Sequence, residues 1–396
     1  MDFEEKRRLT AKLLCQRKKN IGSILVQYET AVMVEDEFKR CFELLANLEE
    51  QQEYLIHKYK NALASFLPLN QPLYSLMLQV FIPSLIMERV YYRPPALLEE
   101  LHVALRNELQ LVLSNAELCT TSRKKFINDF VNKSDIVNFT GKYENVIDLI
   151  KKLPSNIAVV YNGSAINPIV VSIDADIDLA VEDTINARLY NSGQDCMAPA
   201  CIFLDYRITP AFLEALNTKL SSVIVGRNEN SLSAVGPMIE YSSIEHFSRI
   251  KETYGSNILW GGNFDRNKNF IYPTVFYFEH VTLENQNVYY APYFWIMSYS
   301  SIEEIQKYLN SKYCEQYSGY ISLYGKSIQK KDWHSGKNVL IQLENCTLFS
   351  EENGNKEFGG YGIGCGFLYK SGHFFSHPIL LSREINRIME SCDGCL

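Results

Sequence analysis

Apolar strand-like runs that alternate with helical segments limit the fold of this 396-residue chain more than any other feature. Residues 157–161 (IAVVY) and 168–173 (PIVVSI) are typical of buried strands, and a turn separates them. Acidic residues at 174–178 favour the start of a helix that extends to about Tyr190. Strand and helix patterns keep alternating through the rest of the chain, so the sequence predicts an α/β fold.

Four other segments have distinct patterns. Residues 1–62 show helical spacing in a charged background and predict two or three helices. Residues 79–90 are apolar, and residues 97–113 are again helical. Residues 351–366 are rich in glycine, which predicts irregular backbone.

The composition is that of a water-soluble globular protein with a large core and two or three domains: 46% of the residues are hydrophobic and 21% are charged. A net charge of −7 argues against nucleic acid or an anionic membrane as a general partner. Polar residues and a proline interrupt the longest apolar stretch, residues 74–87, so no membrane span is expected. Residues 1–20 have no apolar core of a secretory signal, which favours the cytoplasm.

Ten cysteines in such a chain predict free thiols in a reducing compartment and no disulfide framework. Cys392 and Cys395 form a Cys-x-x-Cys pair close to the C-terminus. A metal site normally needs about four ligands, and no second pair lies nearby in the sequence. No metal is therefore expected.

Cys196 is the strongest candidate for a chemical role, because small and polar residues surround it in the run NSGQDCMA (191–198). A thiolate attacks carbonyl groups, and the resulting thioester can accept hydride or pass its acyl group to another acceptor. A buried cysteine that only fills space is the alternative. The run resembles the nucleophile loop of the aldehyde dehydrogenase superfamily, in which the cysteine holds the substrate while hydride moves to or from a nicotinamide.

Asn70 lies in the run PLNQP (68–72), which resembles the Pro-x-Asn-x-Pro turn of that family. The resemblance implies that the Asn70 amide, together with a backbone N–H at Cys196, stabilises negative charge on the substrate oxygen. Neutral, preorganised donors suit that task. An asparagine that caps its own turn is the alternative.

The resemblance also implies a nicotinamide cofactor site. Arg93 occupies the place of a family lysine that contacts the adenosine ribose, and Ala96 the place of an acid common in NAD-preferring members. Without that acid a 2′-phosphate is tolerated, which favours NADP(H) over NAD(H). Thr140, Gly141 and Lys142 resemble the start of the pyrophosphate loop at a helix N-terminus, with lysine in place of the usual serine. A simple strand-to-helix turn is the alternative.

Further elements resemble scaffold motifs of the family and occur in the family's order. They are VGPMI (235–239), GG (261–262), IYPTV (271–275) and FGGYGIGCG (358–366).

Two positions depart from the family. Alignment on the Asn-Pro step at 167–168 puts Asn162 where hydrolytic members have a glutamate that activates water. An amide cannot accept that proton, so hydrolysis of an acyl-enzyme is expected to be poor. Alignment on Pro292 puts Val288 where a glutamate holds the nicotinamide ribose, and Tyr290 where a phenylalanine flanks the ring.

The resemblance implies an aldehyde dehydrogenase-like architecture: a Rossmann-type cofactor domain at residues 1–163, an α/β catalytic domain at 164–365, and a C-terminal segment at 366–396 that is a candidate oligomer contact. The chain is shorter than typical members, mainly before Asn70, where parts used in strand exchange between subunits normally fall. The sequence therefore predicts a divergent, N-terminally shortened member that forms a monomer or homodimer more readily than a tetramer.

The leading hypothesis is NAD(P)H-dependent reduction of an acyl thioester, carried by coenzyme A or an acyl carrier protein, to an aldehyde through a Cys196 acyl-enzyme. This resembles the acyl-CoA reductases of the family and needs no carboxylate at Asn162. One alternative is aldehyde oxidation with a substitute base, for which Asp195 and Asp205 are nearest in sequence. The other is a degenerate member that serves as a scaffold protein.

Overall fold

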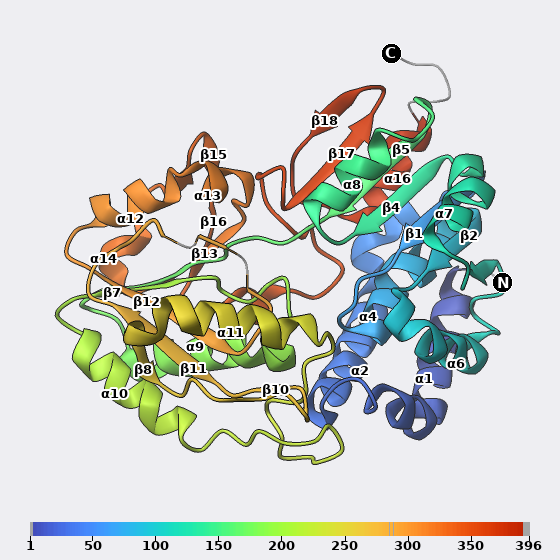
Figure 1. Ribbon diagram of the computed structural model, residues 1–396. Coiled ribbons are helices and arrows are strands. Elements are labelled where there is room, and N and C mark those ends of the chain that lie inside the picture. The colour runs from blue at the N-terminus through green and yellow to red at the C-terminus, as the bar shows by residue number, and fades with distance from the viewer. Residues whose placement is uncertain (1–2, 285, 288, 391–396) are drawn as a thin grey trace.

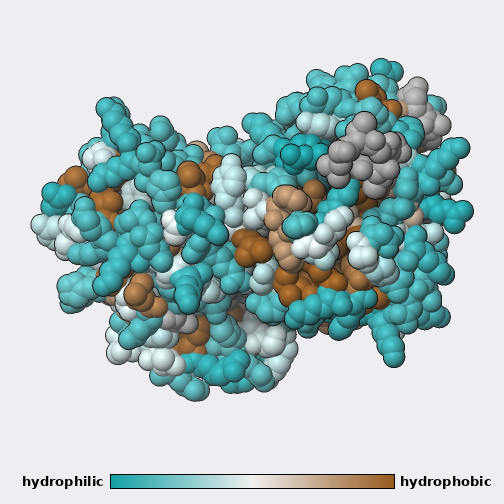
Figure 2. Space-filling view, turned by 90° about the horizontal axis from the view of Figure 1, so that it is seen from above, coloured by the Kyte–Doolittle hydropathy of each residue, from teal (hydrophilic) through white to brown (hydrophobic). Residues whose placement is uncertain are grey.

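Two β-sheets, each covered by helices, form the two lobes of the protein (Figure 1). The computed structural model describes residues 3–284, 286–287 and 289–390. Figure 2 shows that hydrophilic residues cover most of one face, and that hydrophobic residues come to the surface near the place where the lobes meet. The predicted α/β class is confirmed.

The first sheet has the strand order β18–β17–β5–β4–β1–β2–β3. Its strands are β1 (Tyr59–Phe66), β2 (Met87–Arg93), β3 (Ala116–Leu118), β4 (Ile136–Thr140), β5 (Ala158–Asn162), β17 (Gly366–Lys370) and β18 (His373–Phe375). Strands β1 to β5 are parallel, whereas β17 and β18 add an antiparallel edge. The order reverses between β1 and β4, and at such a point open parallel sheets bind ligands beyond the carboxyl ends of their strands.

Helices cover both faces of the first sheet, because successive side chains of a strand point to opposite sides. Leu63 and Val160 pack on one face, and Ala64 and Val159 pack on the other. The first face is covered by α1 (Phe3–Leu25), α2 (Ala31–Ala46), α6 (Glu99–Leu109) and α16 (Leu381–Glu390). The second face is covered by α7 (Arg123–Asp129) and α8 (Tyr143–Ile150).

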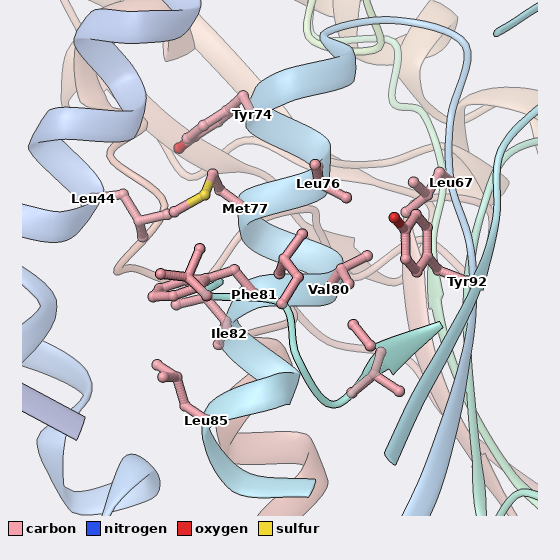
Figure 3. Close-up of a cluster of buried hydrophobic side chains, with 14 of the residues drawn as sticks. Leu44, Leu67, Tyr74, Leu76, Met77, Val80, Phe81, Ile82, Leu85 and Tyr92 are labelled. Atoms are coloured by element: carbon pink, nitrogen blue, oxygen red, sulfur yellow. The ribbon is translucent and has the colours of Figure 1, made fainter. Parts of the chain in front are cut away.

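A helical stretch from Pro72 to Ile86 lies between α2 and the first sheet, and it consists of α4 (Pro72–Leu76), one π-helical turn and α5 (Ile82–Ile86). In Figure 3, Met77 points toward Leu44 of α2, and Leu76 points toward the sheet on the opposite side. The stretch is apolar on both sides because both sides are buried. The apolar segment 79–90 therefore contains the end of a helix and the start of β2.

The second sheet has the order β16–β13–β6–β7–β12–β11–β8, with β8 antiparallel to its neighbour. Its strands are β6 (Ile169–Val171), β7 (Ile202–Asp205), β8 (Ile258–Trp260), β11 (Thr274–Phe278), β12 (Tyr293–Tyr299), β13 (Tyr320–Tyr324) and β16 (Ile341–Glu344). Its longer helices are α9 (Ile177–Leu189), α10 (Thr209–Leu220), α11 (Ser242–Tyr254) and α12 (Ile302–Leu309). Shorter pieces are α13 (Lys312–Gln316), α14 (Lys326–Gln329), α15 (Leu348–Glu351), and the two-residue strands β9 (Phe264–Asp265), β10 (Phe270–Ile271), β14 (His334–Ser335) and β15 (Asn338–Val339).

The local predictions agree well with these elements. The two strand-like runs are β5 and β6, and the helix expected after them is α9, which Asp176 caps by accepting the backbone N–H of Leu179. The glycine-rich segment 351–366 has no helix or strand beyond the last turn of α15 and the start of β17. Residues 1–62 differ in one respect: after α1, α2 and the short α3 (Gln52–Leu55), β1 already begins at Tyr59.

The C-terminal part of the chain returns to the first lobe. Strands β17 and β18 extend the first sheet beside β5, and α16 packs against α5. The three-part division at residues 163 and 365 stays a prediction.

Among the described residues, no helix is long and apolar enough to cross a membrane, no disulfide bond joins the cysteines, and no cluster of side chains could hold a metal ion. The Cys392–Cys395 pair lies outside the described residues. The cytoplasmic location stays a prediction.

Replacement of Leu76 by alanine tests the packing between helix and sheet. Leu76 is fully buried, so Leu76→Ala is expected to lower the free energy of unfolding in urea by about 2–5 kcal/mol through a cavity. The matched control is Leu111→Ala, because Leu111 is 61% exposed and its truncation should cost less than about 0.5 kcal/mol. Equal losses in the two variants would contradict this account of the core.

Candidate functional site

A cleft lies between the lobes, and Cys196 is part of its wall. Asn70, Thr140, Asn162 and Gly163 line it from the carboxyl ends of the first sheet. The structure thus brings the predicted site residues Asn70, Thr140 and Asn162 together with Cys196. Helical residues and the glycine-rich segment also contribute to the wall, among them Gln51, Tyr74, Leu78, Gln79, Ile82, Glu352, Lys356 and Phe358.

The loop that carries Cys196 has an unusual backbone. Asn191, Ser192 and Gly193 have positive φ angles of 45°, 58° and 75°, a conformation that L-residues rarely adopt. A Cβ atom on Gly193 would lie 2.5 Å from the carbonyl group of Ala291, so only glycine fits there. Close backbone contact with Ala291 therefore fixes the conformation of residues 191–193, which lead to Cys196.

Arg188, at the end of α9, holds this loop in place through hydrogen bonds. Its guanidinium is fully buried and donates to the carbonyl oxygens of Pro199, Gly193, Tyr289 and Ala291 at 2.6–3.1 Å. Burial lowers the pKa of Arg188 to about 10, which still leaves it charged at neutral pH.

The loop also contacts VGPMI (235–239), a segment that the sequence marked as a scaffold motif. Ser192 accepts the backbone N–H of Gly236 at 2.8 Å, and Gln194 accepts that of Ile239 at 2.8 Å. The VGPMI element therefore supports the nucleophile loop directly.

Asn167 holds the segment on the other side of Cys196. Its amide donates to the carbonyl oxygen of Met197 at 3.1 Å and accepts the N–H of Tyr320 at 3.2 Å. The sequence predicts no role for Asn167 or Arg188. A lone arginine near a helix C-terminus is the usual sign of an exposed charge, so the residue pattern carries no signal for Arg188.

Asn70 lies beside the nucleophile, as the resemblance implies, but its amide is already engaged. Nδ2 donates to Oδ2 of Asp195 at 2.9 Å, and the amide of Gln71 donates to the same oxygen. One of the two N–H bonds of Asn70 is left for the substrate side. Its role as the oxyanion donor stays a prediction.

The Cys196 thiol is half-buried and faces this carboxylate. Burial, and then the negative charge of Asp195, raise the pKa of Cys196 well above the ordinary value. At neutral pH the resting side chain is therefore a thiol, and its nucleophilicity depends on a group that removes the proton.

Asn162 lies at the end of β5 in a chain of uncharged side chains. Its amide donates to Asn138 at 3.4 Å, and the Asn138 amide donates to Ser65 at 3.0 Å and to Gln79 at 3.4 Å. None of these groups accepts a proton from water at neutral pH.

The predicted cofactor residues lie along the carboxyl edge of the first sheet. Arg93 ends β2, Thr140 ends β4 with a buried hydroxyl that has no partner among the described residues, and Lys142 precedes α8. Arg93 is 3.9 Å from Glu99. The predicted preference for NADP(H) rested on Ala96 in place of an acid, but Glu99 supplies a carboxylate close by, so NADP(H) and NAD(H) are equal candidates.

Two further predicted positions, Tyr290 and Asp205, do not line the cleft. Tyr290 is 40% exposed and its hydroxyl bonds to Ser164, and Val288 lies outside the described residues. Asp205 ends β7, is 2.6 Å from Arg207 and does not line the cleft. Asp205 is therefore a poor substitute base.

Replacement of Arg188 tests the support of the nucleophile loop. Arg188→Met leaves buried carbonyl groups without donors, and we expect it to lower the free energy of unfolding by about 3 kcal/mol or more. The exposed Arg266 provides the control, since Arg266→Met should change stability by less than about 0.5 kcal/mol. Urea denaturation followed by circular dichroism measures both, and a neutral Arg188→Met would contradict this role.

Known proteins resemble this chain in sequence. Lactaldehyde dehydrogenase of Methanococcus maripaludis is 24% identical over 247 residues, which are 61% of this chain and 52% of that protein. The 4,4'-diaponeurosporen-aldehyde dehydrogenase of Staphylococcus aureus is 26% identical over 242 residues, 58% of this chain and 50% of that protein. The chain thus spans about half the length of the curated relatives it matches.

Solved structures share the fold. Succinic semialdehyde dehydrogenase from Streptococcus pyogenes, in complex with NADP+, has a TM-score of 0.80 at 15% identity, over 95% of this chain and 90% of that chain. Glyceraldehyde-3-phosphate dehydrogenase from Methanocaldococcus jannaschii, complexed with NADP, has a TM-score of 0.73 at 20% identity, over 90% and 82%. The model of the aldehyde dehydrogenase family matches residues 108–330, more than half of the chain. This protein therefore belongs to the aldehyde dehydrogenase family.

Proposed function

We propose that this protein is an NAD(P)-dependent oxidoreductase that oxidises an aldehyde through a thioester on Cys196. One observation carries the proposal: Cys196 and the Asn70 amide meet in a cleft at the carboxyl edge of a parallel sheet. A nucleophile beside a neutral donor suits attack on a carbonyl carbon. The relatives named above are aldehyde dehydrogenases, which supports an aldehyde as the substrate.

The carboxyl edge of the first sheet fits a nicotinamide dinucleotide. Gly141 has no side chain to obstruct the backbone, the Thr140 hydroxyl lacks a partner among the described residues, and Arg93 and Lys142 are cationic. When bound there, the nicotinamide would supply the hydride acceptor. The two NADP complexes among the similar structures support an NADP site, while the Arg93–Glu99 contact leaves NAD as an equal candidate.

The rest of the cleft favours a substrate with an apolar body. Leu78, Ile82, Phe358 and Leu380 line it beyond Cys196. Apolar walls gain free energy by burying hydrocarbon, whereas the polar groups near Cys196 orient the carbonyl.

Reduction of an acyl thioester is the second candidate, and Asn162 specifically favours it. A thioester formed on Cys196 has no carboxylate at position 162 to activate water, so exchange with a thiol such as coenzyme A or a carrier-protein thiol is the easier exit. The reaction proceeds through the same acyl-enzyme in the reductive direction when NAD(P)H and an acyl thioester are supplied.

A paired assay tests both directions. We expect the chain to reduce NADP+ or NAD+ with apolar aldehydes, and Cys196→Ala to lower that rate at least about 1,000-fold because no acyl-enzyme forms. Cys15→Ala is the matched control, since Cys15 is exposed on α1. Thioester-dependent oxidation of NAD(P)H without aldehyde oxidation would select the second candidate. Absence of both reactions and of cofactor binding by calorimetry would leave the scaffold hypothesis.

Restoring a carboxylate tests the importance of Asn162. Asn162→Glu should increase release of free acid from the acyl-enzyme about 100-fold, because the new carboxylate can take a proton from water. Asn138→Asp, one step further along the amide chain and outside the cleft, is the control. Acid release is measured by chromatography, and an unchanged rate in Asn162→Glu would show that position 162 does not limit hydrolysis.

A further inference from the structure

Asp195, directly before the nucleophile, is an ionisable group in an unusual place. Its side chain is completely buried. Oδ2 accepts the amides of Asn70 and Gln71, which follow β1 of the first sheet, and Oδ1 accepts the backbone N–H of Met197 at 2.8 Å. These neutral donors compensate the buried charge.

Gln71, which donates to Asp195, has a strained backbone. Gln71 has φ 49° and ψ 60°, in the left-handed region that disfavours a residue with a Cβ. Such strain costs free energy and persists where the surroundings impose it. Here it turns a buried amide toward the carboxylate.

Among the described residues, Glu352 is the only carboxylate that lines the cleft, and its oxygens are occupied, whereas Asp195 is buried behind the wall next to Cys196. Glu352 accepts the Tyr74 hydroxyl at 2.7 Å and pairs with Arg40. Asn162 and Gln79 are neutral amides. Oδ1 of Asp195 accepts a single donor, so it keeps a lone pair for a proton from the adjacent thiol.

We propose that Asp195 is the proton acceptor for Cys196 when the sulfur attacks a carbonyl group, and that its carboxylate also positions the Asn70 amide. This inference rests on the proposed function. It concerns the formation of the acyl-enzyme; Asp195 is too deeply buried to activate water for its hydrolysis.

The step balances without a further reactant. The S–H bond breaks and its proton goes to Asp195, while the sulfur electron pair forms the S–C bond. The π electrons of the carbonyl move onto its oxygen. The negative charge thus moves from Asp195 to the substrate oxygen. One N–H of Asn70 donates to Asp195, and the other would donate to the substrate oxygen. The amide therefore stabilises the charge before and after the transfer, with little reorganisation.

Other charged or titratable groups act on this pair. They are Arg40, Arg188, Tyr190, Tyr290 and Glu352. Arg40 and Arg188 favour the ionised carboxylate, whereas Glu352 opposes a thiolate at Cys196.

Two reactions of Cys196 that need no cofactor test the proposal. The first is alkylation by iodoacetamide from about pH 6 to pH 10, followed by mass spectrometry of the Cys196 peptide, with Cys15 as the internal reference. Asp195→Asn removes the charge that opposes the thiolate, so alkylation near neutral pH should accelerate about 10-fold. The second is acylation by p-nitrophenyl acetate, a carbonyl attack. This attack, unlike alkylation, places negative charge on a carbonyl oxygen and needs the Asn70 amide that the carboxylate positions, so it should slow about 100-fold without Asp195.

The opposite signs of these changes are the expected signature. If alkylation and acylation both accelerated, Asp195 would act only by repelling the thiolate. If both were lost, Asp195 would only maintain the structure of the loop. Either result overturns the proposal. Asp205→Asn, a buried carboxylate at the end of β7 outside the cleft, should change neither rate at Cys196.

Asp195→Glu keeps the carboxylate and is expected to retain slow alkylation and measurable acylation. If Asp195→Asn does not fold, Asp195→Glu and the wild-type chain provide the test. A pH profile of alkylation that is the same for Cys196 and Cys15 would then overturn the proposal. Failure of the proposed function appears separately, as a wild-type chain that acylates at Cys196 but does not turn over aldehydes or thioesters with NAD(P).

Discussion

A buried carboxylate with amide donors from the opposite lobe is the interaction on which the site depends. Asp195 belongs to the loop that enters the second sheet, and Asn70 and Gln71 follow a strand of the first sheet. Because a buried carboxylate without donors costs several kcal/mol, the two loops are held in one relative position. That position puts the thiol and the candidate oxyanion donor in the same cleft.

The nucleophile loop itself is fixed by a buried cation. Arg188 donates to four carbonyl oxygens, two of which belong to the distant residues Tyr289 and Ala291. Gly193 has no side chain, which lets its backbone lie against the carbonyl group of Ala291. Asp195 and Arg188 thus act on the two sides of one loop. Strained backbone at Asn191, Ser192 and Gln71 is the consequence, and it lies where the chemistry is expected.

The polar groups in and beside the cleft differ in what they provide for two steps of the proposed reaction, formation of the acyl-enzyme and its hydrolysis. The thiol has a carboxylate beside it, which suits formation of an acyl-enzyme. The position that faces water in hydrolytic members is an amide in an uncharged chain, which does not suit release to water. Under the proposed function, these residues favour a thioester on Cys196 that is exchanged with a thiol rather than hydrolysed.

The sequence by itself determined the α/β class and indicated Cys196, Asn70, Thr140 and Asn162 as candidate site residues, because strand periodicity and short motifs are properties of neighbouring residues. It also indicated that Asn162 cannot act as a base, which follows from side-chain chemistry alone. Only the tertiary structure decided that Asp195 binds Asn70, that Glu99 lies near Arg93, and that Arg188 is buried. Those contacts depend on how loops and turns from separate strands and helices pack against one another, and residue spacing along the chain does not encode that packing in a readable form.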